Sequence, residues 1–176
     1  IIFGPGIRLG AGITIAPPLA PPLQLTFDPT HLGPSLSLEW SNLSCYATDP
    51  ENSVALVNQP MTYGYRYVMS YTLTFITDPS QAIGLANQNV DLTIPLGVDS
   101  NGIGYYTDGT VYYNNNTIAT GLATWGTPGD IVELAVDTGA QLVWFRVNGG
   151  FWNNDPTADP NSSANGITIP SNNFLY

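Results

Sequence analysis

The sequence contains no lysine, one cysteine, one histidine and few charged residues of any kind. Its 13 acidic residues are opposed by only three basic ones, all arginine, which gives 176 residues a formal net charge of −10. A surface of this sign repels phosphates, so the composition argues against a nucleic-acid partner. Charged residues make up 9% of the chain, so Asn, Ser, Thr and Tyr must provide most of the polar surface.

The single cysteine and the single histidine argue against an internal disulfide and against a metal site built on histidine. Cys45 has no partner for an internal disulfide, and a chain of this length buries a core without one. Its place in the stretch Leu43-Ser-Cys-Tyr46 predicts a small core residue rather than a reactive thiol. His31 lies between Pro29 and Pro34 with no second ligand at metal-binding spacing, which indicates a loop residue.

Long apolar runs are also missing, since no stretch reaches the roughly 18 residues that a membrane helix needs. We therefore predict no membrane insertion. The first residue is Ile1 rather than Met, which indicates a cleaved or truncated product. The lack of lysine, together with many Asn, Thr and aromatic residues, favours a virion surface or an extracellular location over a cytosolic enzyme.

The first 15 residues repeat with a period of six, as apolar-x-apolar followed by Gly or Pro. Each unit buries little by itself, so the repeat must pack on something else. The predicted assembly residues are Ile1, Phe3, Ile7, Leu9, Ile13 and Ile15. Three interpretations are open: the last turns of a homotrimeric shaft, a donor strand that completes a neighbouring subunit's sheet in a filament, or a linker or edge strand of the same chain.

A proline-rich stretch at residues 17–22 marks the predicted domain boundary. Its composition is typical of an extended, semi-rigid connector. The chain is thus divided into an extended Gly/Pro-rich β segment over residues 1–22 and a compact domain over residues 23–176.

The compact domain shows no helical period and frequent turn signals, which predict an all-β fold. The expected strands cover residues 23–27, 35–40, 43–48, 63–76, 82–87, 90–96, 131–136 and 142–147, with residues 28–34 as a loop and a last strand near residues 166–170 paired with the domain's first element. Asp108-Gly109 predicts a tight two-residue hairpin, because both positions tolerate positive φ. It places Tyr106 and Tyr113 on paired strands as a candidate binding surface.

Residues 129–150 form the hairpin around which the domain is arranged. Gly129-Asp130 precedes an apolar strand that ends at Asp137, and a second strand over residues 142–147 is followed by Asn148-Gly149. In the second strand Val143, Phe145 and Val147 share one wholly apolar face, while the other face ends in Arg146.

These motifs resemble the closing signature of SPRY domains, in which a Gly-Asp strand is followed by a strand ending in Phe-x-x-Asn-Gly. Residues 67–75 resemble the family's early tyrosine-containing strand, residues 82–86 its short IGLA-type strand, and residues 102–109 its middle hairpin. The resemblance spans about residues 36–152, and both ends of the chain depart from it. It implies a two-sheet antiparallel SPRY/concanavalin-like sandwich that binds partners through its loops and has no catalytic activity.

Catalytic patterns are missing as well. His31 has no nucleophile motif to act with, and of the acidic residues only Glu39 and Glu133 lie inside predicted strands. The sequence therefore predicts a protein that is not an enzyme and needs no cofactor.

The most distinctive loop follows the second strand and carries Trp152, Asn153, Asn154 and Asp155. An aromatic ring beside amide and carboxylate groups is the chemistry of a carbohydrate site. Calcium is a second interpretation, because Asp155, Asp159 and Asn161 offer oxygen ligands. In the third, Trp152 packs down on the sandwich and the polar residues cap turns.

Taken together, these features predict a non-enzymatic virion-surface module, at the tip of a phage tail fibre or capsid fibre. It would self-associate as a homotrimer and present its loops to a host-surface glycan or protein. The first alternative is an extracellular filament subunit that assembles by donating its N-terminal strand. A further alternative is a peptide-binding SPRY adaptor, which is disfavoured by the six-residue repeats (hexads) of residues 1–15 and by the absence of lysine.

Overall fold

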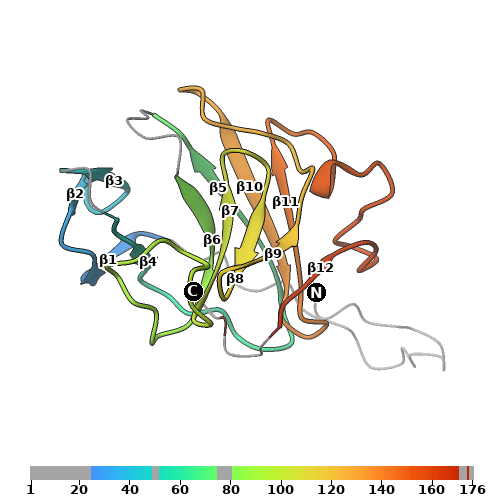
Figure 1. The fold of residues 1–176 in the computed structure, drawn as a ribbon, viewed down its shortest axis with the longest axis horizontal. Coiled ribbons are helices and arrows are strands. Elements are labelled where there is room, and N and C mark those ends of the chain that lie inside the picture. The colour runs from blue at the N-terminus through green and yellow to red at the C-terminus, as the bar shows by residue number, and fades with distance from the viewer. Residues whose placement is uncertain (1–24, 49–51, 75–80, 171–173, 175–176) are drawn as a thin grey trace, which may run out of the picture.

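A computed structural model describes residues 25–48, 52–74, 81–170 and 174. Within them two four-stranded antiparallel sheets face each other (Figure 1). The first has the order β12-β11-β10-β5, with β5 at Arg66–Thr72, β10 at Ile131–Asp137, β11 at Leu142–Val147 and β12 at Ile167–Thr168. The second has the order β6-β7-β8-β9, with β6 at Ala82–Ala86, β7 at Gly102–Tyr106, β8 at Val111–Tyr113 and β9 at Asn116–Ala119. The predicted all-β sandwich is confirmed.

Two small sheets lie to one side of this body (Figure 1). One pairs β1, at Phe27–Leu32, with β4, at Ala55–Val57, and the other is the hairpin of β2, at Leu36–Glu39, and β3, at Ser44–Ala47. On the opposite side in this view, the loop after β11 contains the one helical turn of the described residues, the 3₁₀ turn η1 at Trp152–Asn154. No helix in the described part of the chain has the length and apolar character needed to span a bilayer.

The main core lies between the two large sheets and is built from the alternating inward positions of both. Val132, Leu134 and Val136 of β10 pair across with Val147, Phe145 and Val143 of β11. The second sheet adds the buried side chains of Leu85, Ile103, Tyr105 and Val111. The predicted apolar face of residues 142–147 is therefore the core face.

The other face of β10 and β11 carries a separate small core. Trp144 is completely buried there with Ala135 and Ala158, and Leu142 and Trp152 pack around them. The Trp144 indole N–H donates to the Ala164 carbonyl at 2.8 Å. The loop after β11 thus folds back over this face and closes it.

Glycines allow other backbone segments to approach the strands β6 and β7 closely. Gly84 lies opposite Gly104, and a Cβ at Gly84 would approach the Ile103 carbonyl oxygen to 1.8 Å. A Cβ at Gly104 would lie 2.3 Å from the Leu96 carbonyl oxygen. The segment containing Leu96 therefore crosses closely over this sheet, which only glycine permits.

Several predicted element boundaries are wrong. Residues 90–96 form turns rather than a strand, because the Asp91 carboxylate accepts the backbone N–H of Thr93 and holds a local turn. The first strand, β1, takes up residues 28–32 of the segment predicted as a loop over residues 28–34. Its register shifts between Phe27 and Leu32, an irregular stretch that includes Pro29 and tolerates a proline.

Two pairing details are also corrected. The β7–β8 connection is a turn closed by the Gly109 N–H on the Tyr106 carbonyl, and only Gly109 has positive φ, so it resembles a three-residue loop with a glycine bulge rather than a two-residue hairpin. The last strand, β12, pairs with β11 and not with the first element of the domain. The extended segment over residues 1–22 lies outside the described residues.

Candidate binding surface

The Gly-Asp and Asn-Gly motifs of the central hairpin are joined by hydrogen bonds. The Asn148 side-chain amide donates to Asp130 Oδ1 at 2.9 Å, and its oxygen accepts the Ile131 backbone N–H at 2.9 Å. Asp130 Oδ2 accepts the backbone N–H groups of Gly126 and Thr127 at 2.9 and 2.8 Å. Asp130 therefore holds the loop before β10 in place. The same side chain links the Gly-Asp motif to the Asn-Gly motif.

This loop, residues 124–130, and the β7–β8 turn line an open depression of about 550 Å³. Its lining residues are Thr107, Asp108, Thr124, Trp125, Gly126, Thr127 and Asp130. The loop is held to the turn by the Trp125 backbone N–H, which donates to the Thr107 carbonyl at 3.0 Å. Gly129 donates to the Leu73 carbonyl at 2.7 Å, which anchors the other end of the loop beside β5.

Trp125 is the unusual member of this lining. The residue is only 7% exposed, and its ring packs against Tyr105 with ring centroids 6.0 Å apart. Its indole N–H is buried and has no hydrogen-bond acceptor among the described residues. A buried donor without a partner costs about 1–3 kcal/mol. Because Trp125 is also a lining residue of the depression, an acceptor that reached this N–H would remove that cost.

The depression is acidic. Asp108 is exposed, and one of its oxygens accepts the Thr110 backbone N–H at 2.9 Å. The hydrogen bond from the Asn148 side chain, with those from Thr127 and Gly126, lowers the pKa of Asp130 below its ordinary value of 3.8. Two carboxylates therefore lie at this surface, which favours a ligand with cationic or hydrogen-bond-donating groups.

The loop predicted as a carbohydrate site uses its polar groups internally. Asn153 accepts the Phe145 backbone N–H at 3.0 Å and donates to the Asn165 carbonyl at 2.9 Å. Asn154 donates to the Gly121 carbonyl at 3.1 Å. Asp155 accepts the Thr157 backbone N–H and hydroxyl through one oxygen, and the Asn165 amide through the other.

The ring of Trp152 is half-buried in the same loop. The Arg146 guanidinium carbon lies 4.2 Å from the ring centroid and covers one face of it. Arg146 also forms a two-pronged contact with Glu133, at 2.7 and 2.8 Å. The interpretation in which Trp152 packs down and its neighbours cap turns describes these contacts, and the carbohydrate site stays a prediction.

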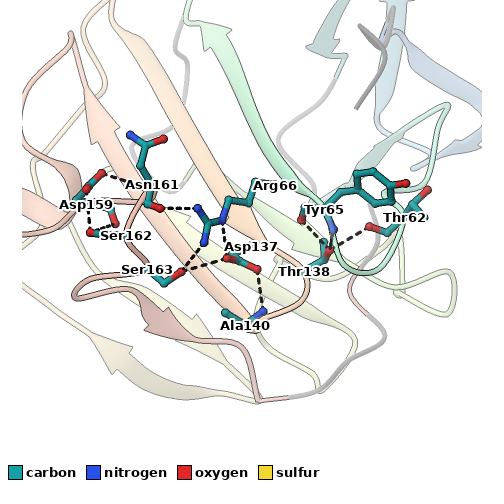
Figure 2. A network of polar contacts seen from close by, with 10 residues as sticks. All are labelled: Thr62, Tyr65, Arg66, Asp137, Thr138, Ala140, Asp159, Asn161, Ser162 and Ser163. Carbon is teal, nitrogen blue, oxygen red and sulfur yellow. Dashed lines mark hydrogen bonds and ion pairs between the residues drawn. The ribbon is translucent and has the colours of Figure 1, made fainter. Parts of the chain in front are cut away.

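The far end of this loop is tied to the sheet by a polar network (Figure 2). Arg66 donates to Asp137 at 2.7 Å, to Ser163 at 2.9 Å and to the Asn161 carbonyl. Burial raises the pKa of Asp137, but hydrogen bonds from Ala140, Arg66 and Ser163 outweigh it and leave the pKa below 3.8. The network joins the start of β5, the end of β10 and residues 159–163, so its role is structural.

The structure does not bring the two candidate tyrosines together. Tyr106 shares the outer face of its sheet with Tyr112 and donates to the Leu96 carbonyl at 2.9 Å. Tyr113 lies opposite Ile103 on the core-facing side, where its ring packs edge-on against Phe174. They lie on opposite faces, so they do not form one surface.

The candidate calcium ligands lie in the loop after β11, and the thiol of Cys45 lies on β3. In the described ranges no group of three or more His, Cys, Asp or Glu side chains has the arrangement to hold a metal ion. Calcium binding at Asp155, Asp159 and Asn161 therefore stays a prediction. Cys45 is half-buried, and burial raises its pKa to about 11, which leaves the thiol protonated at neutral pH.

Sequence reasoning missed the depression and Trp125. The signal was present, since Trp125 stands in a Thr-Trp-Gly-Thr-Pro-Gly stretch directly before Asp130. A tryptophan between glycines and a proline indicates a loop, but the sequence does not show whether its indole N–H finds an acceptor.

No protein-family model and no curated protein matches the chain. Among solved structures it is similar to the SPRY domain of human HERC1, with 19% identity, a TM-score of 0.61, and coverage of 72% of this chain and 77% of that one. It is also similar to the TRIM65 PSpry domain, with 12% identity and a TM-score of 0.52, covering 80% of this chain and 84% of that one.

The structure of stonustoxin also matches, with 13% identity and a TM-score of 0.52, over 74% of this chain and 22% of the toxin chain. The likeness at these identities is one of fold. The chain therefore has a SPRY-like fold, as the four motifs predicted.

Proposed function

We propose that this domain is a non-enzymatic recognition module that binds a segment of a partner protein in the depression beside Trp125. The observation that carries the proposal is that Trp125 is one of the residues lining the open depression, while its buried indole N–H has no acceptor among the described residues. A peptide carbonyl is the acceptor that such a donor suits. The two SPRY domains with a similar fold are consistent with a protein-binding role.

The charge of the site indicates the chemistry of the partner. Asp108 and Asp130 lie at the depression, and the whole chain carries a net charge of −10. Electrostatic complementarity therefore favours a segment containing Lys or Arg.

The proposed setting is the surface of a virion or another extracellular surface. It is supported by the lysine-free composition and by the hexads of residues 1–15. A phage tail or capsid fibre that carries this module at its tip is the first form of the proposal, and an extracellular filament subunit is the second. The intracellular peptide-binding adaptor shares the same site, so the binding proposal does not depend on the setting.

A displayed library of random peptides, selected on the immobilised full chain, tests the proposal. We expect selected peptides to carry basic residues and to lose affinity by about tenfold or more when Thr124→Arg adds bulk and positive charge to the rim. Thr117→Arg is the matched control, because Thr117 is equally exposed but does not line the depression.

Binding that resists Thr124→Arg, or that responds equally to both variants, would contradict the proposed site. A glycan array on the same protein tests the Trp152 loop separately. Glycan binding abolished by Trp152→Ala, with no peptide selected, would favour the carbohydrate prediction instead.

A further inference from the structure

β5 is the outermost strand of its sheet, and β10 is its only strand partner among the described residues. The pairing runs from Arg66 to Thr72 without a register shift. An edge of this kind presents a row of backbone donors and acceptors on which another strand can form.

Hydrogen bonds at both ends of β5 show which residues face this edge. The Thr138 N–H donates to the Tyr65 carbonyl at 3.0 Å, and the Leu73 N–H donates to the Asp130 carbonyl at 2.8 Å. Because the direction of backbone groups alternates along an antiparallel strand, the odd-numbered residues face β10. The even-numbered residues direct their N–H and C=O groups outward: Arg66, Val68, Ser70 and Thr72.

Edge strands commonly carry residues or irregularities that prevent pairing with another strand, and β5 has few of these features. It contains no proline, glycine, lysine or bulge. Its one charge, Arg66, stands at the first position and is bound to Asp137. Val68 is 63% exposed on the outer face, and Met69 and Tyr71 on the core-facing side are only partly buried. Among the described residues no strand pairs with this edge, and the side chains of Met69 and Tyr71 beside it are only partly covered.

Residues 7–15, which lie outside the described residues, have the pattern of a strand that suits this edge. The odd positions are all apolar, namely Ile7, Leu9, Ala11, Ile13 and Ile15, and the even positions are Arg8, Gly10, Gly12 and Thr14. Strict alternation of this kind indicates a strand with one buried face. No proline interrupts residues 6–16, so every backbone N–H in this stretch is able to pair.

We propose that β5 accepts residues 7–15 of a second copy of this chain as an added strand. The apolar face of that strand would continue the core beyond Met69 and Tyr71. A second copy is favoured because residues 17–22 include four prolines, a composition that favours a stiff, extended connector. At about 3.1 Å per residue, such a connector would span about 19 Å, which would help residues 7–15 to reach a neighbouring copy. This assembly contact is distinct from the ligand site proposed above and does not depend on it.

Amide hydrogen exchange of the full chain at a series of protein concentrations tests the contact. At low concentration we expect the amides of Met69 and Tyr71 to be protected and those of Val68, Ser70 and Thr72 to exchange freely. At high concentration the three even-numbered amides should exchange at least about tenfold more slowly, since they gain hydrogen bonds in the assembly. Exchange that stays fast at every concentration would overturn the proposal. Protection that persists at the lowest concentration would also overturn it, because the segment would then pair with its own domain.

Two variants make the test specific, with sedimentation velocity as the measurement. Ser70→Pro removes an outward N–H and no bond to β10, and Ser70→Ala is its control. Ile13→Asp places a charge on the apolar face of the donor segment without changing the domain, and Ile13→Val is its control. We expect each test variant to weaken self-association by about tenfold or more while each control behaves like the parent chain. Self-association that is unchanged in either test variant would contradict the proposal.

Discussion

Two loops of this protein, each with a buried tryptophan indole in it or beneath it, differ in how their polar groups are hydrogen-bonded. In the loop after β11, Asn153 spans from Phe145 to Asn165, and the Trp144 indole beneath it is bonded to Ala164. In the loop before β10, the Trp125 indole N–H is buried without an acceptor among the described residues. Residue type alone does not show whether the polar groups of such a loop are paired. The difference lies in which buried polar groups the fold leaves unpaired, and four variants test it.

The largest effect is expected from Asn153→Ala in the loop after β11. It leaves the Phe145 backbone N–H without its partner and removes the bond to Asn165, so we expect a loss of about 2–3 kcal/mol in the free energy of unfolding. Asn154→Ala is the matched control, because Asn154 also has positive φ but loses only an exposed bond to Gly121. Urea unfolding measures both. Equal losses would mean that the loop is not held by Asn153.

A smaller loss is expected from Asp137→Ala, which breaks the network at the far end of the same loop. Ala140 and Ser163 lose an acceptor, and Arg66 loses its carboxylate. Since Arg66 is half-exposed and water replaces part of the interaction, we expect a loss of about 2 kcal/mol. Thermal unfolding measures it, with Asp91→Ala, an exposed turn carboxylate, as the control. A loss no larger than that of Asp91→Ala would contradict the structural role of the network.

A loss of about 1 kcal/mol is expected from Arg146→Lys. Lysine keeps the charge but forms neither the two-pronged contact with Glu133 nor the planar stack on Trp152. The tryptophan fluorescence emission of the protein should shift as the Trp152 ring becomes more exposed. An unchanged emission and stability would show that Arg146 does not hold this ring.

The smallest effect is expected on pH dependence, and it compares the two loops directly. Hydrogen bonds lower the pKa of Asp130 in one loop and of Asp137 beside the other. Their stabilisation is complete above the ordinary value of 3.8 and is lost as the pH falls through the lower folded-state values. Stability should therefore decline below about pH 4, and Asp130→Asn should flatten this decline by less than about 1 kcal/mol. A chain whose stability is constant from pH 5 to about pH 2 would contradict this account.

The sequence predicts the central part of the fold well, because its signals are local. Alternation places Val143, Phe145 and Val147 in the core, and the turn residues around Asp137 and Asn148 define the hairpin. The strand predicted at residues 90–96 is wrong because Asp91 forms a turn with Thr93, which competes with sheet pairing.

The candidate site was harder to predict, since it depends on contacts between distant residues. Tyr106 and Tyr113 are close in sequence, but the pleat places them on opposite faces. The sequence suggests that the Asn153 amide binds a ligand, whereas in the structure it accepts the Phe145 backbone N–H. Trp125 is notable because its indole N–H has no acceptor among the described residues, and no sequence pattern predicts this.

The central claim is that the depression beside Trp125 binds a partner segment. Its most direct test is the tryptophan indole region of an NMR spectrum of the full chain, recorded during titration with a library-selected peptide. We expect the Trp125 indole N–H to shift as it gains an acceptor and the Trp144 indole N–H, already bonded to Ala164, to stay in place. Movement of the Trp144 or Trp152 signal with Trp125 unchanged would contradict the account.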